Sequence, residues 1–137
     1  KGICRRKRQS IGIIFDSTLN ARQGAEIKIR KIRKMKKKPI IYAILPDDLR
    51  RAFIAFLHRD RKFSDSHFYR THAGARRTLL EIAENYPEVQ IQIYESFFEK
   101  DILSFKKLVF SSNKEQIEFL KRNQYTEKEI LNLIKNL

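Results

Sequence analysis

The sequence has one cysteine, three prolines, four glycines and no tryptophan among its 137 residues. The single cysteine, Cys4, excludes an internal disulfide. The scarcity of glycine and proline, with 42% hydrophobic residues, is typical of a folded chain rather than a linker. No apolar run approaches the roughly 18 residues of a membrane span, and none follows the basic residues 1–9, so we expect neither a membrane helix nor a signal peptide. We therefore expect residues 1–137 to form a single cytoplasmic domain.

Acidic residues are also few compared with basic ones. Lysine and arginine number 30 against 16 for aspartate and glutamate, which gives a formal net charge of +14. An excess of this size predicts an anionic partner, such as a nucleic acid, a nucleotide, a sugar phosphate or an acidic protein.

Apolar runs of strand length alternate with helical periods along most of the chain. We expect strands at 11–15, 40–45 and 89–94, helices at 20–37, after Pro46 and at 67–85, and a loop at 58–66. Residues 95–112 are less regular, with a helical turn expected at 102–107 and a strand at 108–110. Two short helices are expected over 113–137, the second capped by Thr126 with Glu129. This order predicts an α/β fold with a core at 10–96 and a parallel sheet covered by helices on both faces.

The stretch SIGIIFDSTLNARQG, residues 10–24, places polar residues where the first expected strand gives way to a helix. Ligands of open α/β sheets bind at the carboxyl ends of strands, so Asp16 and Thr18 are candidate binding residues. The alternative is that Asp16, Ser17 or Thr18 only caps the helix that follows.

Two stretches together resemble the zeta-toxin family of P-loop kinases. They are IIFDSTL at 13–19 and the series IIYAILPDDLRRAFIAFLHRDRKFSDSHFYRTHAGARRTLLEIAENYPEVQIQIYE at 40–95. The resemblance covers roughly residues 8 to 96 and consists of the order and spacing of these segments. It implies a P-loop NTPase-like fold and a kinase that phosphorylates UDP-N-acetylglucosamine or a related UDP-amino sugar with ATP. It also implies a small helical antitoxin as a partner protein.

The resemblance further implies roles for individual residues. Asp16 and Thr18 fall where the family holds the sugar. Asn20, also a candidate for binding the substrate, falls where the family often has a substrate-binding arginine. Arg59 and Arg61 fall in the loop that carries the family's phosphate-contacting arginines, so a catalytic and nucleotide-binding role is implied for both. Guanidinium groups suit this role because they stabilise the charge on transferring phosphoryl oxygens. The alternative is a solvated charge run around Asp60.

The phosphate loop of that family is absent from the sequence. No G-x-x-x-x-G-K-[ST] motif occurs, and Gly2, Gly12, Gly24 and Gly74 cannot form one. The family's phosphate loop lies N-terminal to the region matched here, so ATP and Mg²⁺ are expected to bind only with that portion present. The chain is therefore expected to be inactive alone, whether it is part of a longer protein, the partner of a separate N-terminal half or a degenerate relative.

Two nuclease patterns and one metal pattern are weaker alternatives. Asp16 with Glu26 and Lys28 has the D-x9-E-x-K spacing of a restriction-type nuclease, but the helical period of 20–37 points the last two residues to different sides. Arg51 with His58 fits the R-x6-H spacing of a helical ribonuclease, which the three expected strands disfavour. The histidines have poor spacing and no cluster of cysteines or carboxylates near them, so no metal site is expected.

The main alternative function is that of a basic nucleic-acid-binding protein without catalysis. Its signal is the density of cations at 28–38, which could contact phosphates along a nucleic acid. The eight cations are Lys28, Arg30, Lys31, Arg33, Lys34, Lys36, Lys37 and Lys38.

Overall fold

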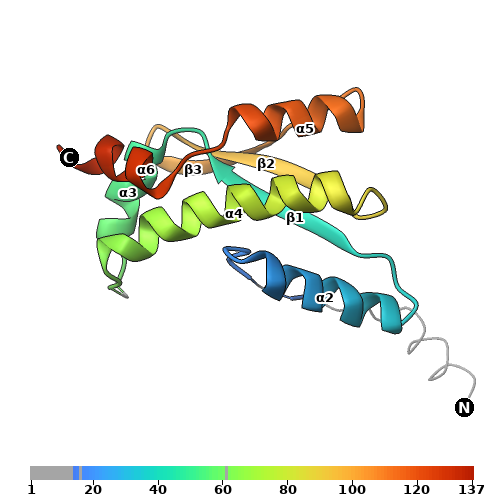
Figure 1. The fold of residues 1–137 in the computed structure, drawn as a ribbon. Coiled ribbons are helices and arrows are strands. Elements are labelled where there is room, and N and C mark those ends of the chain that lie inside the picture. The colour runs from blue at the N-terminus through green and yellow to red at the C-terminus, as the bar shows by residue number, and fades with distance from the viewer. Residues whose placement is uncertain (1–13, 16, 61) are drawn as a thin grey trace, which may run out of the picture.

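The computed structural model describes residues 14, 15, 17–60 and 62–137. Figure 1 shows one layer of helices in front of a small sheet. In chain order the elements are α2 (Arg22–Lys34), β1 (Ile40–Pro46), α3 (Leu49–Leu57), α4 (Asp65–Asn85), β2 (Gln90–Glu99), β3 (Ile102–Lys107), α5 (Asn113–Arg122) and α6 (Glu127–Ile134). The α/β class predicted from the sequence is confirmed.

The described sheet has three strands in the order β1-β2-β3 and is only partly parallel. β1 and β2 are parallel, with Ile40 opposite Gln90 and Pro46 opposite Ser96. α3 and α4 lie between these strands in the sequence, as a parallel pair requires. β3 pairs with β2 in the antiparallel direction.

The hairpin formed by β2 and β3 corrects the prediction for residues 95–112. Residues 102–107 form a strand rather than a helical turn, and 108–110 lie outside any strand. Lys100 and Asp101 make the two-residue connection with φ angles of 50° and 65°. Positive φ at both positions is the geometry of a type I′ turn, which glycine and asparagine favour. The sequence therefore lacked the usual signal for this turn.

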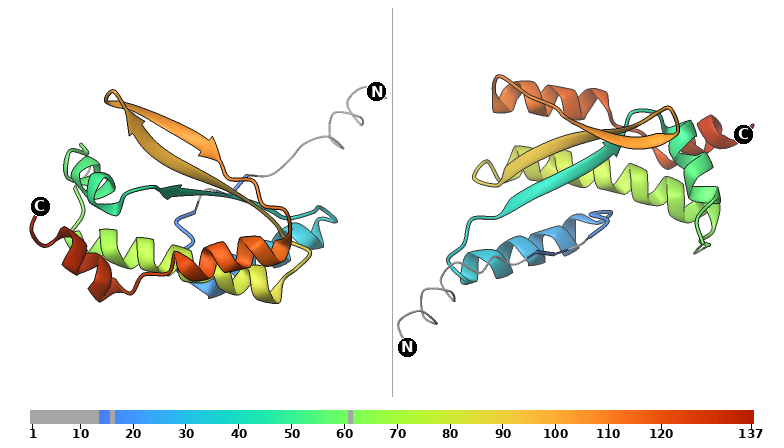
Figure 2. Two further views of the ribbon diagram at one scale, coloured as in Figure 1. Left: turned by 90° about the horizontal axis from the view of Figure 1, so that it is seen from above. Right: turned by 180° about the vertical axis from the view of Figure 1, so that it is seen from behind.

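Helices cover one face of the sheet in the described part of the chain. Alternate residues of β1 and β2 point into a core with Ala25 and Ile29 of α2, Leu79 and Ile82 of α4 and Leu120 of α5. The opposite face carries exposed apolar side chains on β1 and β3, and Figure 2 (right) shows no helix over it. These side chains are Ile40, Tyr42, Ile44, Leu103 and Phe105. The prediction of helices on both faces is therefore wrong for the described residues, because helices α2, α4 and α5 all lie on the same side.

A second apolar cluster joins α3, the beginning of α4 and α6. Its buried residues include Leu49 and Phe53 of α3, Phe68 of α4 and Ile130 of α6. α6 begins with the predicted capping box, in which the Thr126 hydroxyl and the Glu129 carboxylate each accept a backbone N–H of the other residue. This cluster fixes α3 at one end of α4.

The segment before α2 differs from its prediction as a buried strand. Ile14 and Phe15 are outside any strand, and the side chain of Ile14 is 94% exposed. The remaining residues of that expected strand, 11–13, lie outside the described part. A short apolar run predicts burial but does not specify the strand with which it would pair.

The same segment does not cap α2 through Ser17 or Thr18. The N-cap is Ala21, and no side-chain hydrogen bond from the described residues caps the helix. Ser17 Oγ instead accepts hydrogen bonds from Leu19 N at 3.2 Å and from Lys28 Nζ at 2.7 Å.

Candidate anion-binding cavity at the carboxyl ends of β1 and β2

A cavity of about 470 Å³ opens where β1 ends and α3 begins. Its wall includes Pro46 of β1, Glu95 of β2, Arg76 of α4 and Tyr125 from the connection between α5 and α6. Four elements that are distant in the sequence thus meet at the carboxyl end of the parallel pair, which is where open α/β sheets bind their ligands.

The start of α3 forms one side of the cavity. Asp47 N donates a hydrogen bond to Ser96 O at 2.9 Å, which ties the end of β1 to β2. Asp48 is the N-cap of the helix, and its Oδ1 accepts a hydrogen bond from Arg50 N at 2.8 Å. Arg50 and Arg51 also line the cavity. Arg51 Nε lies 4.0 Å from Asp48 Oδ2, so its charge is partly paired. The amino end of a helix carries a partial positive charge, so the helix and Arg50 favour an anion on this side.

Arg76 is the most unusual residue of the cavity because it is a buried cation with few partners. It is only 4% exposed. Its Nη1 lies 3.5 Å from both Nδ1 and the carbonyl oxygen of His72, and its Nε has no hydrogen-bond partner in the described part of the chain. Its Cζ lies 5.4 Å from the centre of the Tyr125 ring. Among the described residues, no carboxylate lies within 4.0 Å of the Arg76 guanidinium.

Burial and the positive charges near Arg76 both affect the protonation of His72. Burial, followed by the charges of Arg76 and Arg59, lowers the pKa of His72 from 6.5 to about 4. Its imidazole is therefore neutral at pH 7, and a neutral ring nitrogen can accept a hydrogen bond from Arg76. Burial also lowers the pKa of Arg76, against a smaller opposite effect of Tyr125.

None of the predicted site residues that the structure describes lines this cavity. Arg59 follows α3, is exposed, and is close enough to affect His72 electrostatically. Thr18 and Asn20 are exposed and do not line the cavity. Asp16 and Arg61 lie outside the described residues.

The described residues are not arranged as the nuclease and metal-site alternatives would require. Glu26 hydrogen-bonds to Arg22, which lowers the pKa of its carboxyl group, and Lys28 hydrogen-bonds to Ser17. His67 stacks on Phe63 with ring centres 4.4 Å apart. In the part of the chain that the structure describes, no three histidine, cysteine, aspartate or glutamate residues form a group that could hold a metal ion.

Arg76 was missed as a candidate when the sequence was interpreted, although the pattern contains a signal for it. It lies eight residues after Phe68 and three before Leu79, on the apolar stripe of α4. A charged residue on a buried stripe departs from the ordinary amphipathic pattern of a helix. Such a position deserves consideration as a site residue.

Comparison of the chain with models of known protein families, with curated proteins and with solved structures gives no match. The zeta-toxin resemblance therefore stays a prediction from the sequence. The described helices include none with the length and apolar character needed to cross a membrane.

Proposed function

We propose that this chain is a zeta-toxin-like phosphotransferase, an ATP-dependent kinase of a UDP-amino sugar or a related nucleotide, or the carboxyl-terminal part of one. The observation that supports this most directly is the cavity at the carboxyl end of β1, where α3 begins and where three arginines and three carboxylates line one wall. A phosphorylated ligand suits this combination of helix terminus and guanidinium groups.

The proposal assigns the following roles. Arg59 and Arg61 stabilise phosphoryl charge, and Asp16, Thr18 and Asn20 bind the sugar, all by resemblance to the family. ATP and Mg²⁺ require the phosphate-loop portion, which is supplied by a longer chain or by a separate one. A helical antitoxin is the expected protein partner.

Calorimetric titration of the 137-residue chain with UDP-N-acetylglucosamine tests the proposal. We expect saturable binding that Thr18→Ala weakens and that Arg122→Ala, at an exposed residue of α5, leaves unchanged. With a phosphate-loop portion added, Arg59→Ala should slow phosphoryl transfer by about 10³-fold. Absence of sugar-nucleotide binding would overturn the proposal.

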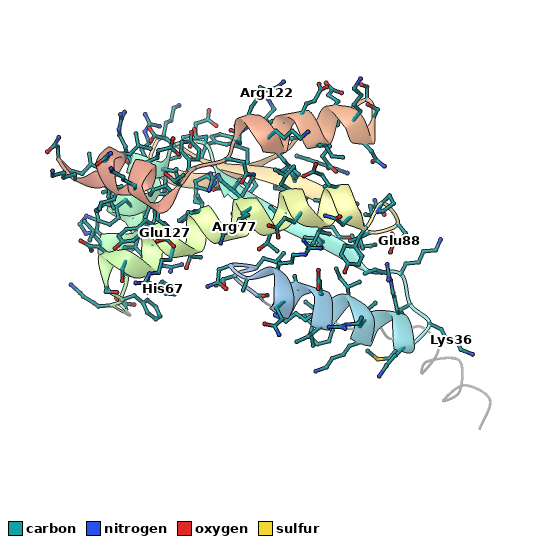
Figure 3. The ribbon with its side chains drawn as sticks, in the orientation of Figure 1. Lys36, His67, Arg77, Glu88, Arg122 and Glu127 are labelled. Atoms are coloured by element: carbon teal, nitrogen blue, oxygen red, sulfur yellow. The ribbon has the colours of Figure 1, made fainter. Side chains whose placement is uncertain are left out.

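A second candidate function is non-specific nucleic-acid binding, which the basic surface of α2 and the turn after it favours. Of the eight cations at 28–38, Arg33 pairs with Glu88 and Lys28 hydrogen-bonds to Ser17. The other six make no ion pair within the described residues. Three of them, Lys36, Lys37 and Lys38, follow the end of α2, where Figure 3 labels Lys36. Six phosphate contacts give a slope of about −5 for log affinity against log salt on duplex DNA.

Titration with a short duplex at several salt concentrations separates the two functions. For a nucleic-acid binder, replacing Lys36, Lys37 and Lys38 with glutamine should reduce the slope by about 3, because three phosphate contacts are lost. Arg59→Ala should then have little effect. Tight duplex binding without sugar-nucleotide binding would favour this second function over the kinase.

A further inference from the structure

The Arg76 guanidinium is a buried positive charge for which the described residues supply no counterion. Its Nε is unpaired, and its Nη1 reaches only His72, at 3.5 Å. Burial of an ion is unfavourable unless an opposite charge or several hydrogen bonds replace its hydration. Tyr125 compensates in part through its ring face, but it accepts no hydrogen bond from the guanidinium in this structure.

The place of Arg76 makes a ligand the natural counterion. Arg76 is part of the cavity wall, and the amino end of α3 with Arg50 and Arg51 is part of the same wall. Positively charged groups of α3 and α4 therefore line the same cavity. Asp48 is already occupied, because it is the N-cap of α3 and its Oδ2 lies 4.0 Å from Arg51 Nε. Neither Asp47 nor Glu95 lies within 4.0 Å of Arg76, so the buried Arg76 has no carboxylate partner among the described residues.

We infer that Arg76 is the buried anchor for a phosphate group of a ligand bound in this cavity. A guanidinium matches phosphate oxygens with two parallel hydrogen bonds, and a phosphate has further oxygens for the donors of α3. The carboxylates of Asp47 and Glu95 also line the cavity, and they can accept hydrogen bonds from hydroxyl groups. The ligand class is therefore a phosphorylated polyhydroxy compound, such as a sugar phosphate or a nucleoside diphosphate.

This inference rests on the proposed function for the type of ligand, but it concerns a residue to which the zeta-toxin resemblance gives no role. It also does not require the chain to transfer a phosphoryl group. It can therefore be tested on the 137-residue chain with simple phosphate probes.

The experiment measures binding of inorganic pyrophosphate at constant ionic strength by calorimetry, for the wild type, Arg76→Gln and Arg77→Gln. Arg77 is the matched control because it is the next residue of α4, is exposed, and loses the same charge on substitution (Figure 3). We expect Arg76→Gln to weaken binding at least tenfold and Arg77→Gln to change it less than twofold. Equal losses in the two variants, or no pyrophosphate binding by the wild type, would overturn the inference.

Two further measurements separate an anchor from a structural residue. Without ligand, Arg76→Gln should be at least as stable to urea as the wild type, because it removes a buried charge that lacks a counterion. A residue needed for packing on Tyr125 would instead destabilise the protein when replaced. If Arg76→Gln does not fold, Arg76→Lys keeps the charge without the paired donors and should bind pyrophosphate at least fivefold more weakly; unchanged binding by this variant would overturn the inference.

The nuclear magnetic resonance titration of His72 provides a site-specific readout. Bound pyrophosphate should raise the pKa of His72, because the anion offsets the charge of Arg76 beside the ring. An unchanged pKa at saturation would place the ligand elsewhere and overturn the inference.

Pyrophosphate binding through Arg76 without affinity for a UDP-amino sugar would support the anchor and refute the proposed sugar nucleotide. If the chain binds a UDP-amino sugar and Arg76→Gln leaves that binding intact, the result would support the proposed sugar nucleotide and refute Arg76 as its anchor.

Discussion

Replacement of Gly74 by alanine tests the contact between α4 and the segment that precedes α2. Gly74 is buried within α4. An added Cβ would lie 3.1 Å from the Cα and carbonyl carbon of Asn20 and would overlap the Asn20 carbonyl oxygen. The obstructing atoms are backbone atoms, which cannot move aside as the end of a flexible side chain can.

The expected loss follows from two opposing effects. Alanine is about 1 kcal/mol more favourable than glycine inside a helix. Overpacking of a buried contact costs about 1–3 kcal/mol, and a clash with backbone atoms belongs at the upper end of that range. We therefore expect Gly74→Ala to lower the free energy of unfolding by about 2 kcal/mol.

Gly24→Ala is the matched control for this prediction. Gly24 also lies inside a helix, α2, but an added Cβ there meets nothing within 4 Å. We expect this variant to raise the free energy of unfolding by about 0.5–1 kcal/mol. Urea unfolding followed by far-ultraviolet circular dichroism measures both values. The packing described for Asn20 is refuted if Gly74→Ala proves as stable as Gly24→Ala.

Four further substitutions test the pH response, the capping box and the sheet. The pKa of His72 is about 4 in the folded protein against 6.5 as its ordinary value, so the unfolded chain binds more protons between these pH values and stability falls by up to about 3 kcal/mol as the pH is lowered through them. His72→Gln should remove this loss, and equal pH dependence of urea unfolding in both proteins would contradict it. Thr126→Ala should cost about 1 kcal/mol of stability by loss of the α6 cap, and an unchanged urea midpoint would argue against the cap. Replacement by threonine should affect Ile44 and Ile93 differently, because Ile44 is 58% exposed and Ile93 is fully buried. We expect Ile44→Thr to change the free energy of unfolding by at most about 0.5 kcal/mol and Ile93→Thr to lower it by about 3 kcal/mol. Similar losses would show that the face carrying Ile44 is covered.

The features that could be predicted from the sequence are those with a local physical cause. The apolar run 40–45 and the alternating run 89–94 became the parallel pair β1 and β2. The Thr126 capping box depends on two side chains three residues apart, so its sequence pattern specified it completely.

The features that could not be predicted depend on contacts distant in the sequence or on uncommon turn residues. The hairpin turn at Lys100 and Asp101 has positive φ angles without glycine or asparagine, so no sequence signal marked it. The residues that cover a sheet face are a tertiary property, and the strand periodicity of β1 did not show that one of its faces is open.

One part of the candidate site could be predicted from the sequence and another part was missed. Pro46 followed by two aspartates indicated where β1 ends and α3 begins, and the cavity lies there. Arg76 was missed because the apolar residues of α4 were used to identify its buried stripe, and the charged residue on that stripe was not considered as a site residue.

The open face of the sheet and the buried charge of Arg76 are both departures from ordinary α/β packing. Parallel strands normally have both faces covered, yet Ile40, Tyr42 and Ile44 are exposed in the described part of β1. Sequences depart from such rules where another group completes the structure. Under the proposed function, the phosphate of the substrate would supply the negative charge that the buried guanidinium of Arg76 lacks. Within the described residues, the open face of the sheet has no such complement.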